Sequence, residues 1–351
     1  MLNRTCARGS RYFALVGLVF YLFPARIYAF SGTEAASFLD LPVGARPAAM
    51  GSAYAALATD AYAPTFNPAG LGFLASPEVS GMYVPFLVDT SYEYGSFVYP
   101  LAPGYSLGAA VQYFMPGNLT GTDVNDNPIG SIGGYYAAYS LSYGQKLGDY
   151  VSVGATGKMI QGQIDDVSAS AFAADFGTLV RVNDRLSLAA TLDNLGQKMT
   201  FLQQDDALPL AEHLGAAFKL FHPLTISVEG VHRNYGMNSF AAGWEWMNNE
   251  GFSIRGGYNS DRTDQLNGFA GLSLGVGLRV WGQEFSYAWI PFGDLGSAHY
   301  FAIVVKFGQH SERSEHDVLM QDAEFDSDYS LMNKMLEDGN DSHDLNKELG
   351  N

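Results

Sequence analysis

The chain has 351 residues, enough for one large closed sheet or two ordinary domains. Its formal net charge of −17 argues against a nucleic-acid partner, because a strongly negative chain repels phosphate. The one cysteine, Cys6, lies in a segment that we expect to be removed, which excludes disulfides and Cys-ligated metals from the mature protein. The 40 glycines, 21 tyrosines and 23 phenylalanines favour thin, bent strands bordered by aromatic rings.

Residues 1–29 have the pattern of a secretory signal peptide. Arg4, Arg8 and Arg11 precede an apolar run over residues 13–23, and Ala29 closes a plausible cleavage site. The apolar run is shorter than the roughly 20 residues that a membrane-spanning helix needs. An uncleaved anchor is the alternative. Since no later segment has the length of a spanning helix, a membrane role would require a closed β-barrel, because lipid satisfies no backbone hydrogen bonds.

Residues 30–77 are predicted to form an N-terminal hatch. The segment is rich in alanine and glycine, and small residues over 48–56 predict a helical stretch that packs closely. The residues of this stretch are Ala48, Ala49, Ser52, Ala53, Ala55 and Ala56. Such a helix suits a plug inside a barrel lumen, and a simple periplasmic arm is the alternative.

Residues 78–308 alternate with period two, the mark of strands with one apolar face. In the last segment Phe301, Ile303 and Val305 share one face, while Tyr300 and Ala302 lie on the other. The segments number about fourteen, at 78–86, 91–100, 104–115, 131–146, 150–161, 169–181, 185–193, 209–220, 224–233, 238–247, 251–259, 266–280, 284–291 and 297–307. A soluble sandwich would show the same alternation, so the period alone does not decide the fold.

The connections between these segments favour a barrel. Every second connection is tight, whereas the intervening ones include the long polar stretches 116–130 and 194–208. Short turns at one rim and longer loops at the other are typical of outer-membrane barrels, whose short turns lie in the periplasm. The sequence therefore predicts an all-β protein, an antiparallel transmembrane barrel of about fourteen strands in the outer membrane. An even strand number would place both termini in the periplasm.

Aromatic residues cluster near the predicted strand ends. We interpret them as rings at the two membrane–water interfaces, with ordinary strand-core aromatics as the alternative. They are Tyr83, Phe86, Tyr92, Tyr94, Tyr113, Phe114, Tyr135, Tyr136, Trp244, Trp246, Tyr287 and Trp289. Pro85 and Pro116 mark places where a lateral break in the wall is expected, because proline removes a ladder donor.

Residues 309–351 differ in character from the barrel. They hold twelve Asp or Glu against three Lys or Arg, which predicts a disordered acidic tail in the periplasm. A short amphipathic helix over residues 331–336 that binds a partner is the alternative.

Catalytic, cofactor and metal sites are not predicted. The seven histidines are scattered without metal-binding spacing, and no nucleophile or nucleotide motif is present. The acidic pairs at Asp165 and Asp166 and at Asp205 and Asp206 are expected to be solvated surface, with Ca²⁺ binding as the alternative. One functional hypothesis is nevertheless an enzyme whose catalytic Ser and His come from neighbouring strands.

Three motifs carry a resemblance to a known family. They are GARPAAMGSAYAALATDAYAPTFNPAGL at 44–71, DNLGQKM at 193–199 and SYAWIPFGDLGSAHYFAIVVKFG at 286–308. In this order and spacing the chain resembles the PorV/PorQ family, a branch of the FadL-like outer-membrane transporters, over residues 38–308. It departs from the family at Tyr300, where a basic residue is usual, and in the 44 residues after Phe307.

The resemblance implies a fourteen-stranded barrel with an N-terminal segment in or under the lumen, acting without enzymatic activity or a cofactor. Family members serve type IX protein secretion by binding or shuttling exported cargo, and uptake of small hydrophobic molecules through a FadL-like channel is the alternative. Expected partners are outer-membrane lipid, secretion components or cargo, and hydrophobic small molecules.

The motif residues are expected to be structural. Asn67, Pro68, Ala69 and Gly70 would turn the chain from hatch to barrel, with an extended Asn67 and a positive φ at Gly70. The residues of the last hairpin would form an outer turn that Asp294 caps; they are Pro291, Phe292, Gly293, Asp294, Leu295, Gly296 and His299.

Overall fold

The computed structural model describes residues 34–308 apart from 87–88, 118, 123–124, 126, 264–267 and 293–295. The predictions for the signal peptide and for the acidic tail therefore concern residues outside the described part of the chain. The barrel unit ends at Phe307.

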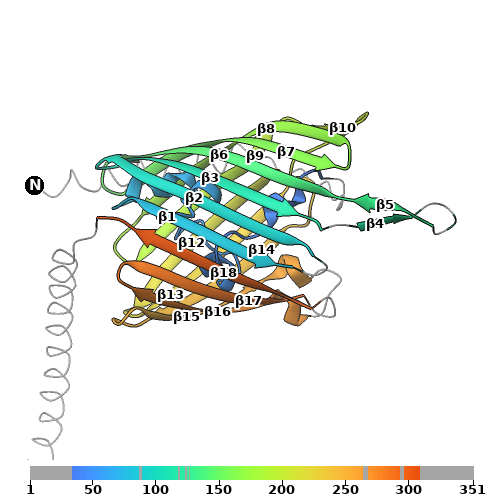
Figure 1. The fold of residues 1–351 in the computed structure, drawn as a ribbon. Helices are drawn as coiled ribbons and strands as arrows, with labels where there is room; N and C mark the ends of the chain where they lie inside the picture. The colour runs from blue at the N-terminus through green and yellow to red at the C-terminus, as the bar shows by residue number, and fades with distance from the viewer. Residues whose placement is uncertain are drawn as a thin grey trace, which may run out of the picture. The chain divides into compact units, whose positions relative to one another are not determined.

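Fourteen antiparallel strands form one closed barrel, in which the first strand pairs with the last (Figure 1). The predicted all-β, fourteen-stranded barrel is confirmed. The strands are β1 (Glu78–Pro85), β2 (Ser91–Ala102), β3 (Tyr105–Met115), β6 (Gly134–Leu147), β7 (Val151–Ile164), β8 (Val167–Arg181), β9 (Leu186–Gly196), β12 (Ala211–Phe221), β13 (Leu224–Arg233), β14 (Ser239–Met247), β15 (Phe252–Asn259), β16 (Leu272–Val280), β17 (Gln283–Pro291) and β18 (Ser297–Lys306).

The period-two pattern places apolar side chains outside and small or polar ones inside. In β18, Phe301 is 51% exposed on the outer face, whereas the neighbouring Tyr300 is fully buried on the lumen face. Large apolar residues occupy the outer face of most strands, for example Leu141 on β6 and Phe172 on β8. Because side chains alternate between the two faces of each strand, the polar residues face the lumen and the outer wall is apolar. Such a wall is typical of barrels that lie in lipid. No helix in the described residues is long and apolar enough to cross a membrane.

The two ends of the barrel differ. One end, here called the short-turn end, has tight turns in which Gly104, Gly148, Gly251 and Gly282 adopt positive φ. The opposite end, here called the loop end, has the longer connections, although the link between β7 and β8 is also a tight turn. These loops also contain two hairpins that the sequence did not predict: β4 (Leu119–Thr122) with β5 (Pro128–Ile132), and β10 (Met199–Phe201) with β11 (Gln204–Asp206).

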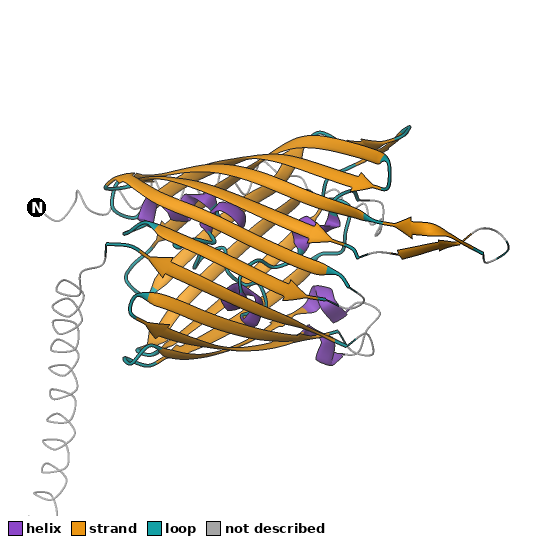
Figure 2. Ribbon diagram, in the orientation of Figure 1, coloured by secondary structure: helices purple, strands orange, loops and turns teal. Residues whose placement is uncertain are grey.

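Residues 34–77 form a hatch that fills the lumen, and Figure 2 shows its short helices enclosed by the strands. Its elements are η1 (Ser37–Asp40), α2 (Ala45–Ala49), α3 (Ala63–Phe66) and η2 (Pro68–Phe73). The predicted helical stretch over 48–56 is wrong, because α2 ends at Ala49. Gly51 and Ser52 adopt φ of 67° and 70°, which cannot continue an α-helix.

Glycines in the barrel wall leave space for the backbone of the hatch. A Cβ at Gly177 would lie 2.1 Å from Oδ1 of Asn67, and a Cβ at Gly243 would lie 2.4 Å from the carbonyl oxygen of Met50. Such glycines let two backbones approach more closely than any side chain permits. The expectation that glycine serves mainly to bend strands is therefore incomplete, because many of these glycines are contact points between wall and hatch.

Candidate functional site

A buried chain of charges fastens the hatch to the wall. Nε and Nη2 of Arg46 in α2 donate to the carboxylate of Glu245 in β14, at 2.8 and 2.6 Å. Glu245 also accepts from Nε of Arg255 at 2.7 Å, and Arg255 continues to Glu284 at 2.6 Å. Because the Glu245 side chain is only 4% exposed, its charge needs both arginines. We call this series, residues 46, 245, 255 and 284, the arginine latch.

Within the hatch, Arg46 also stabilises its own loop. Its Nη1 donates to the hydroxyl of Tyr54 at 2.8 Å and pairs with Asp60 at 3.2 Å. Burial, and then the neighbouring Asp60 charge, raise the pKa of Tyr54 well above its ordinary value, although Arg46 acts in the opposite direction. Tyr54 therefore remains protonated and donates its hydroxyl hydrogen to Asp60.

Two further wall carboxylates hold hatch backbone groups. Glu229 in β13 accepts the N–H of Ala55 at 2.9 Å and contacts His213 at 2.8 Å. Glu78 in β1 accepts the N–H of Ala61 at 3.1 Å. Several charged side chains of the lumen face thus contact the hatch or one another.

The DN pair of the second motif forms a β-bulge. The register of β8 and β9 shifts next to Asp175, opposite Asp193 and Asn194. Asn194 has a φ of 61°, and its N–H donates to Asp175 at 2.7 Å. Its side chain accepts from Lys158 at 2.9 Å and donates to the carbonyl of Pro209 at 2.9 Å. Lys158 and Asp175 complete a buried ion pair at 2.6 Å. The motif thereby anchors the loop after β9 to the wall.

The four motif residues Asn67, Pro68, Ala69 and Gly70 lie inside the lumen against the wall. The Asn67 side chain accepts from the N–H of Ala69 at 3.1 Å and donates to the carbonyls of Ala55 and Thr178, at 3.0 and 3.3 Å. Asn67 has the extended backbone that its position before Pro68 favours.

Gly70 has a different role from the one expected. It lies within η2 without a positive φ, so the positive φ predicted for this glycine is wrong. A Cβ there would lie 1.5 Å from the carbonyl oxygen of Ala58. Close approach of two hatch segments, rather than a left-handed conformation, therefore requires glycine at this position.

A cavity of about 690 Å³ opens at the loop end, and we call it the mouth cavity. Its aromatic lining comes from η1, from the outer ends of strands and from the β10–β11 hairpin: Phe38, Phe86, Phe114, Tyr136, Phe201 and Phe292. The rings contact one another, with centroids of Phe38 and Tyr136 5.8 Å apart and those of Phe86 and Phe292 6.4 Å apart. Mostly apolar concave surfaces with few polar groups are typical of small-molecule sites.

The hatch closes the mouth cavity from below. Leu41 lines the cavity, and the residues that follow it are packed without solvent contact, as Val43, Ala48 and Met50 show with 0% exposure. The first described residue, Glu34, bridges Ala207 at the loop end, so the described part of the hatch begins at that end. The described hatch residues lie across the lumen below the cavity.

Carboxylates are the charged groups in the described lining of the mouth cavity. Glu34 and Asp206 line it, and Oε1 of Glu34 is buried without a hydrogen-bond partner among the described residues. Burial, followed by the nearby charge of Asp40, raises the pKa of Glu34. Burial likewise raises the pKa of Asp40, although Arg233 opposes the shift. Arg233 forms ion pairs with Asp40 at 3.6 Å and with Asp261 at 3.2 Å, so these two carboxylates share its positive charge.

The last hairpin contributes to this site in part. Phe292, which follows β17, lines the mouth cavity, and its N–H donates to the carbonyl of Gly296 at 2.7 Å. The expected turn residues Gly293, Asp294 and Leu295 lie outside the described residues. Pro291 ends β17, and His299 faces outward, where Nδ1 contacts the Tyr287 hydroxyl at 2.8 Å. His299 is therefore not a lumen residue.

The interpretation of the strand-end aromatics as interfacial rings is wrong for five of them. Phe86, Phe114 and Tyr136 line the mouth cavity, and Tyr92 and Tyr94 are buried in the lumen. Neighbouring residues of a strand point to opposite faces, so pairs such as 113 and 114 divide between lipid and lumen. This alternation was the available signal for the cavity residues. Glu34 gave no such signal, because its neighbours Arg233 and Asp261 come from distant segments.

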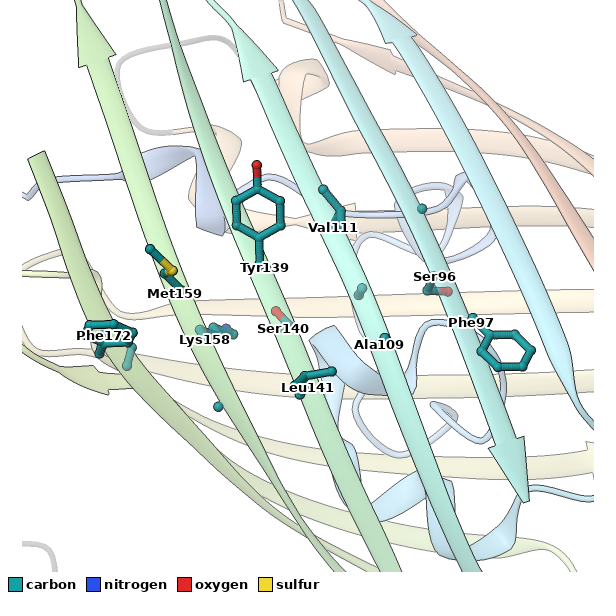
Figure 3. A pocket seen from close by; sticks show the side chains of 14 residues that line it. Ser96, Phe97, Ala109, Val111, Tyr139, Ser140, Leu141, Lys158, Met159 and Phe172 are labelled. Atoms are coloured by element: carbon teal, nitrogen blue, oxygen red, sulfur yellow. The ribbon is translucent and has the colours of Figure 1, made fainter. Parts of the chain in front are cut away.

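A second hollow, of about 780 Å³, lies on the outer wall over β2, β3, β6, β7 and β8 (Figure 3). Figure 3 shows Phe97, Tyr139 and Leu141 around it, with Lys158 behind the strands. The ladder beneath it is continuous, as the pairs Ala109–Leu141 and Leu141–Gly157 show. It is a depression in the lipid-facing surface and not an opening.

The expected lateral break at Pro116 is not found in the described ladder, because Pro116 lies beyond the end of β3. At Pro85 the ladder is intact on one side only. Pro85 pairs with Ser91 of β2, whereas the pairing of β1 with β18 stops at Tyr83, so Val84 and Pro85 have no ladder partner in β18. The rings of Tyr300 and Phe86, 6.4 Å apart, pack beside this end of the seam.

Metal-binding clusters of three or more His, Cys, Asp or Glu are absent from the described part of the chain. Asp165 lies in the turn between β7 and β8 with a φ of 52°. Asp205 accepts from Thr200 at 2.7 Å, and Asp206 accepts from Gln204 at 3.0 Å, so both carboxylates serve the β10–β11 hairpin.

The sequence matches no protein-family model and no curated protein. Among solved structures the fold is similar to the CymD monoaromatic hydrocarbon channel, with a TM-score of 0.56 and 12% identity over 76% of this chain and 98% of that chain. The fold is also similar to the Pseudomonas putida toluene transporter TodX, with a TM-score of 0.54 and 12% identity over 74% of this chain and 96% of that chain. A Pseudomonas aeruginosa FadL homologue has a TM-score of 0.52 and 12% identity over 79% of this chain and 98% of that chain. At this identity the likeness to these three channels shows a shared fold alone.

Proposed function

We propose that this protein is a non-enzymatic outer-membrane channel that takes up small hydrophobic molecules. The observation that carries the proposal is the aromatic mouth cavity at the loop end of a closed barrel whose outer wall is apolar. Rings that line a concave site bind apolar ligands through buried area and ring packing. The fold is shared with channels for monoaromatic hydrocarbons and toluene, which supports the same class of ligand here.

In this proposal the loop end faces the outside and the short-turn end faces the periplasm. β1 begins and β18 ends at the short-turn end, so the acidic tail would begin on the periplasmic side. A ligand would collect in the mouth cavity and pass when the hatch moves away from its floor. The wall ladder is continuous under the outer hollow, so that hollow is not an exit, and we assign passage to movement of the hatch.

A reversible tether tests this function. A Cβ at Gly215 would lie 3.5 Å from Cβ of Ala55, within the range that a disulfide needs. We expect an Ala55→Cys, Gly215→Cys variant to fix the hatch to β12 when oxidised. Uptake of a labelled aromatic hydrocarbon by Gram-negative cells that express it should then fall to the level of cells without the protein.

Reduction should restore that uptake to the level of the unsubstituted protein. The single Gly215→Cys variant is the control, because it carries the same wall change without a tether. Uptake that is the same in the oxidised and reduced double variant, at wild-type level, would refute passage by way of the hatch. Uptake that never exceeds that of cells without the protein would refute the channel function.

A role in type IX protein secretion is the second candidate, and the three sequence motifs favour it. Binding of exported cargo would use the loops or the acidic tail rather than the mouth cavity. Co-purification of secretion-machinery components with the full chain, lost on removal of residues 309–351, would support this role. Normal secretion of cargo in cells that lack the protein would exclude it.

A further inference from the structure

The mouth cavity carries charge of one sign, and this bears on which hydrophobic molecules it accepts. Its lining contains two carboxylates, those of Glu34 and Asp206, and no Lys or Arg among the described lining residues. Asp206 accepts from Gln204 at 3.0 Å. Oε1 of Glu34 is buried and accepts no hydrogen bond from the described residues. A buried acceptor without a donor is costly, so rotation of the Glu34 carboxylate toward a donor on a ligand in the cavity would relieve that cost.

The cation that acts on this carboxylate, Arg233, also pairs with two other carboxylates. Arg233 pairs with Asp40 at 3.6 Å and with Asp261 at 3.2 Å. Its Nη1 also donates to the Ser239 hydroxyl at 3.2 Å. Together with Glu34, these charged groups leave the floor of the cavity with a surplus of negative charge. A ligand carboxylate placed among them would be desolvated beside like charges, which disfavours binding.

Resting on the channel function proposed above, we propose that the mouth cavity selects aromatic molecules that carry a hydrogen-bond donor or a positive charge, and rejects aromatic carboxylates. The aromatic rings would bind the apolar body, as Phe38, Phe114 and Phe201 surround the cavity. The donor group would bind the carboxylate of Glu34, whose side chain lines the cavity. An ammonium group can also contact ring faces, which adds to its preference over a neutral ligand.

Three probes of matched shape test this selection: 1-naphthylmethylamine, 1-naphthylmethanol and 1-naphthoate. Their binding to the full-length protein in detergent is measured by calorimetry at neutral pH. We expect the amine to bind about tenfold more tightly than the alcohol, since a charge-assisted hydrogen bond is roughly twice as strong as a neutral one. We expect the naphthoate to bind more weakly than both.

The substitution Glu34→Gln keeps the size of the side chain and removes its charge. It should abolish the preference for the amine, whereas Glu93→Gln, the same change on the exposed outer face of β2, should leave it intact. Phe201→Ala should weaken all three probes, because it removes one ring of the cavity without touching the carboxylates. Electrophoretic mobility before and after heating verifies that each variant remains a folded barrel.

The outcomes separate this inference from the channel function. Naphthoate that binds as tightly as the amine, or an amine preference that survives Glu34→Gln, would overturn the selection while the cavity remains a ligand site. Absence of binding by all three probes would overturn both the selection and the proposed ligand site.

Discussion

The arginine latch makes a sharp prediction about how firmly the hatch is held. Replacing Arg46 by Met keeps the apolar stem and removes the guanidinium that contacts Glu245 at 2.8 and 2.6 Å. Glu245 would then retain Arg255 as its one cation, in a side chain that is 4% exposed. Breaking a buried ion pair costs about 3–5 kcal/mol. Because Arg46 is 20% exposed and Arg255 remains, we expect the lower value, about 3 kcal/mol.

This loss should appear as a larger population of barrels with a displaced hatch. About 3 kcal/mol corresponds to a change of roughly a hundredfold in that population. Ala48 in α2 has no exposed surface, so a cysteine placed there reacts with a maleimide only when the hatch leaves its seat. In the Ala48→Cys background, Arg46→Met should raise the labelling rate by roughly a hundredfold.

Lys219 supplies the matched control. It is exposed near the end of β12 and forms no ion pair among the described residues, so its charge should contribute less than about 1 kcal/mol. Lys219→Met should therefore leave the labelling rate within a few-fold of the background. Equal labelling rates in the two methionine variants would refute the assignment of Arg46 as the fastener of the hatch.

Other predictions concern the hatch and the mouth cavity. Gly70→Ala should destabilise the folded barrel by about 3 kcal/mol or more in denaturant titration, whereas Gly157→Ala, whose Cβ meets nothing within 4 Å, should change it by less than about 1 kcal/mol. Asn67→Ala leaves buried backbone groups of Ala55 and Ala69 without their partner and should cost about 2–4 kcal/mol in the same titration; no measurable loss would show that water replaces the amide. Because burial raises the pKa of Glu34 above 4.5, an aromatic amine should lose affinity as the pH falls, beginning above pH 4.5; a midpoint at or below 4.5 would contradict this.

The barrel could be predicted from sequence because its strands obey a local rule. Alternation in segments such as Phe301, Ile303 and Val305 records which face meets lipid, and glycines at tight turns such as Gly104 and Gly148 mark the short-turn end. These signals lie within a few residues of one another. The strand bounds accordingly agree with the expected segments, apart from some strand ends. The segment expected at 266–280, for example, begins as β16 only at Leu272, after the short helix η4 (Gly268–Gly271).

The hatch and the mouth cavity could not be predicted in the same way. The path of the hatch is set by contacts with wall residues far along the chain, as Asn67 with Thr178 and Arg46 with Glu245 show. Its alanines predicted one helix, yet the hatch packed inside the wall forms only short helices and turns. Glu34 became a candidate only when the fold placed it beside Phe38 and Phe201 in one cavity.

The seam between β1 and β18 has a consequence for the order of assembly. Glu78 accepts from Nζ of Lys306, 228 positions later, at 2.7 Å, and the same carboxylate accepts the N–H of Ala61 in the hatch. Pairing partners so distant in the chain form late in folding, because a long loop must close before they contact. One carboxylate holds both the seam and the hatch, so closure of the wall at Glu78 and seating of the hatch stabilise each other.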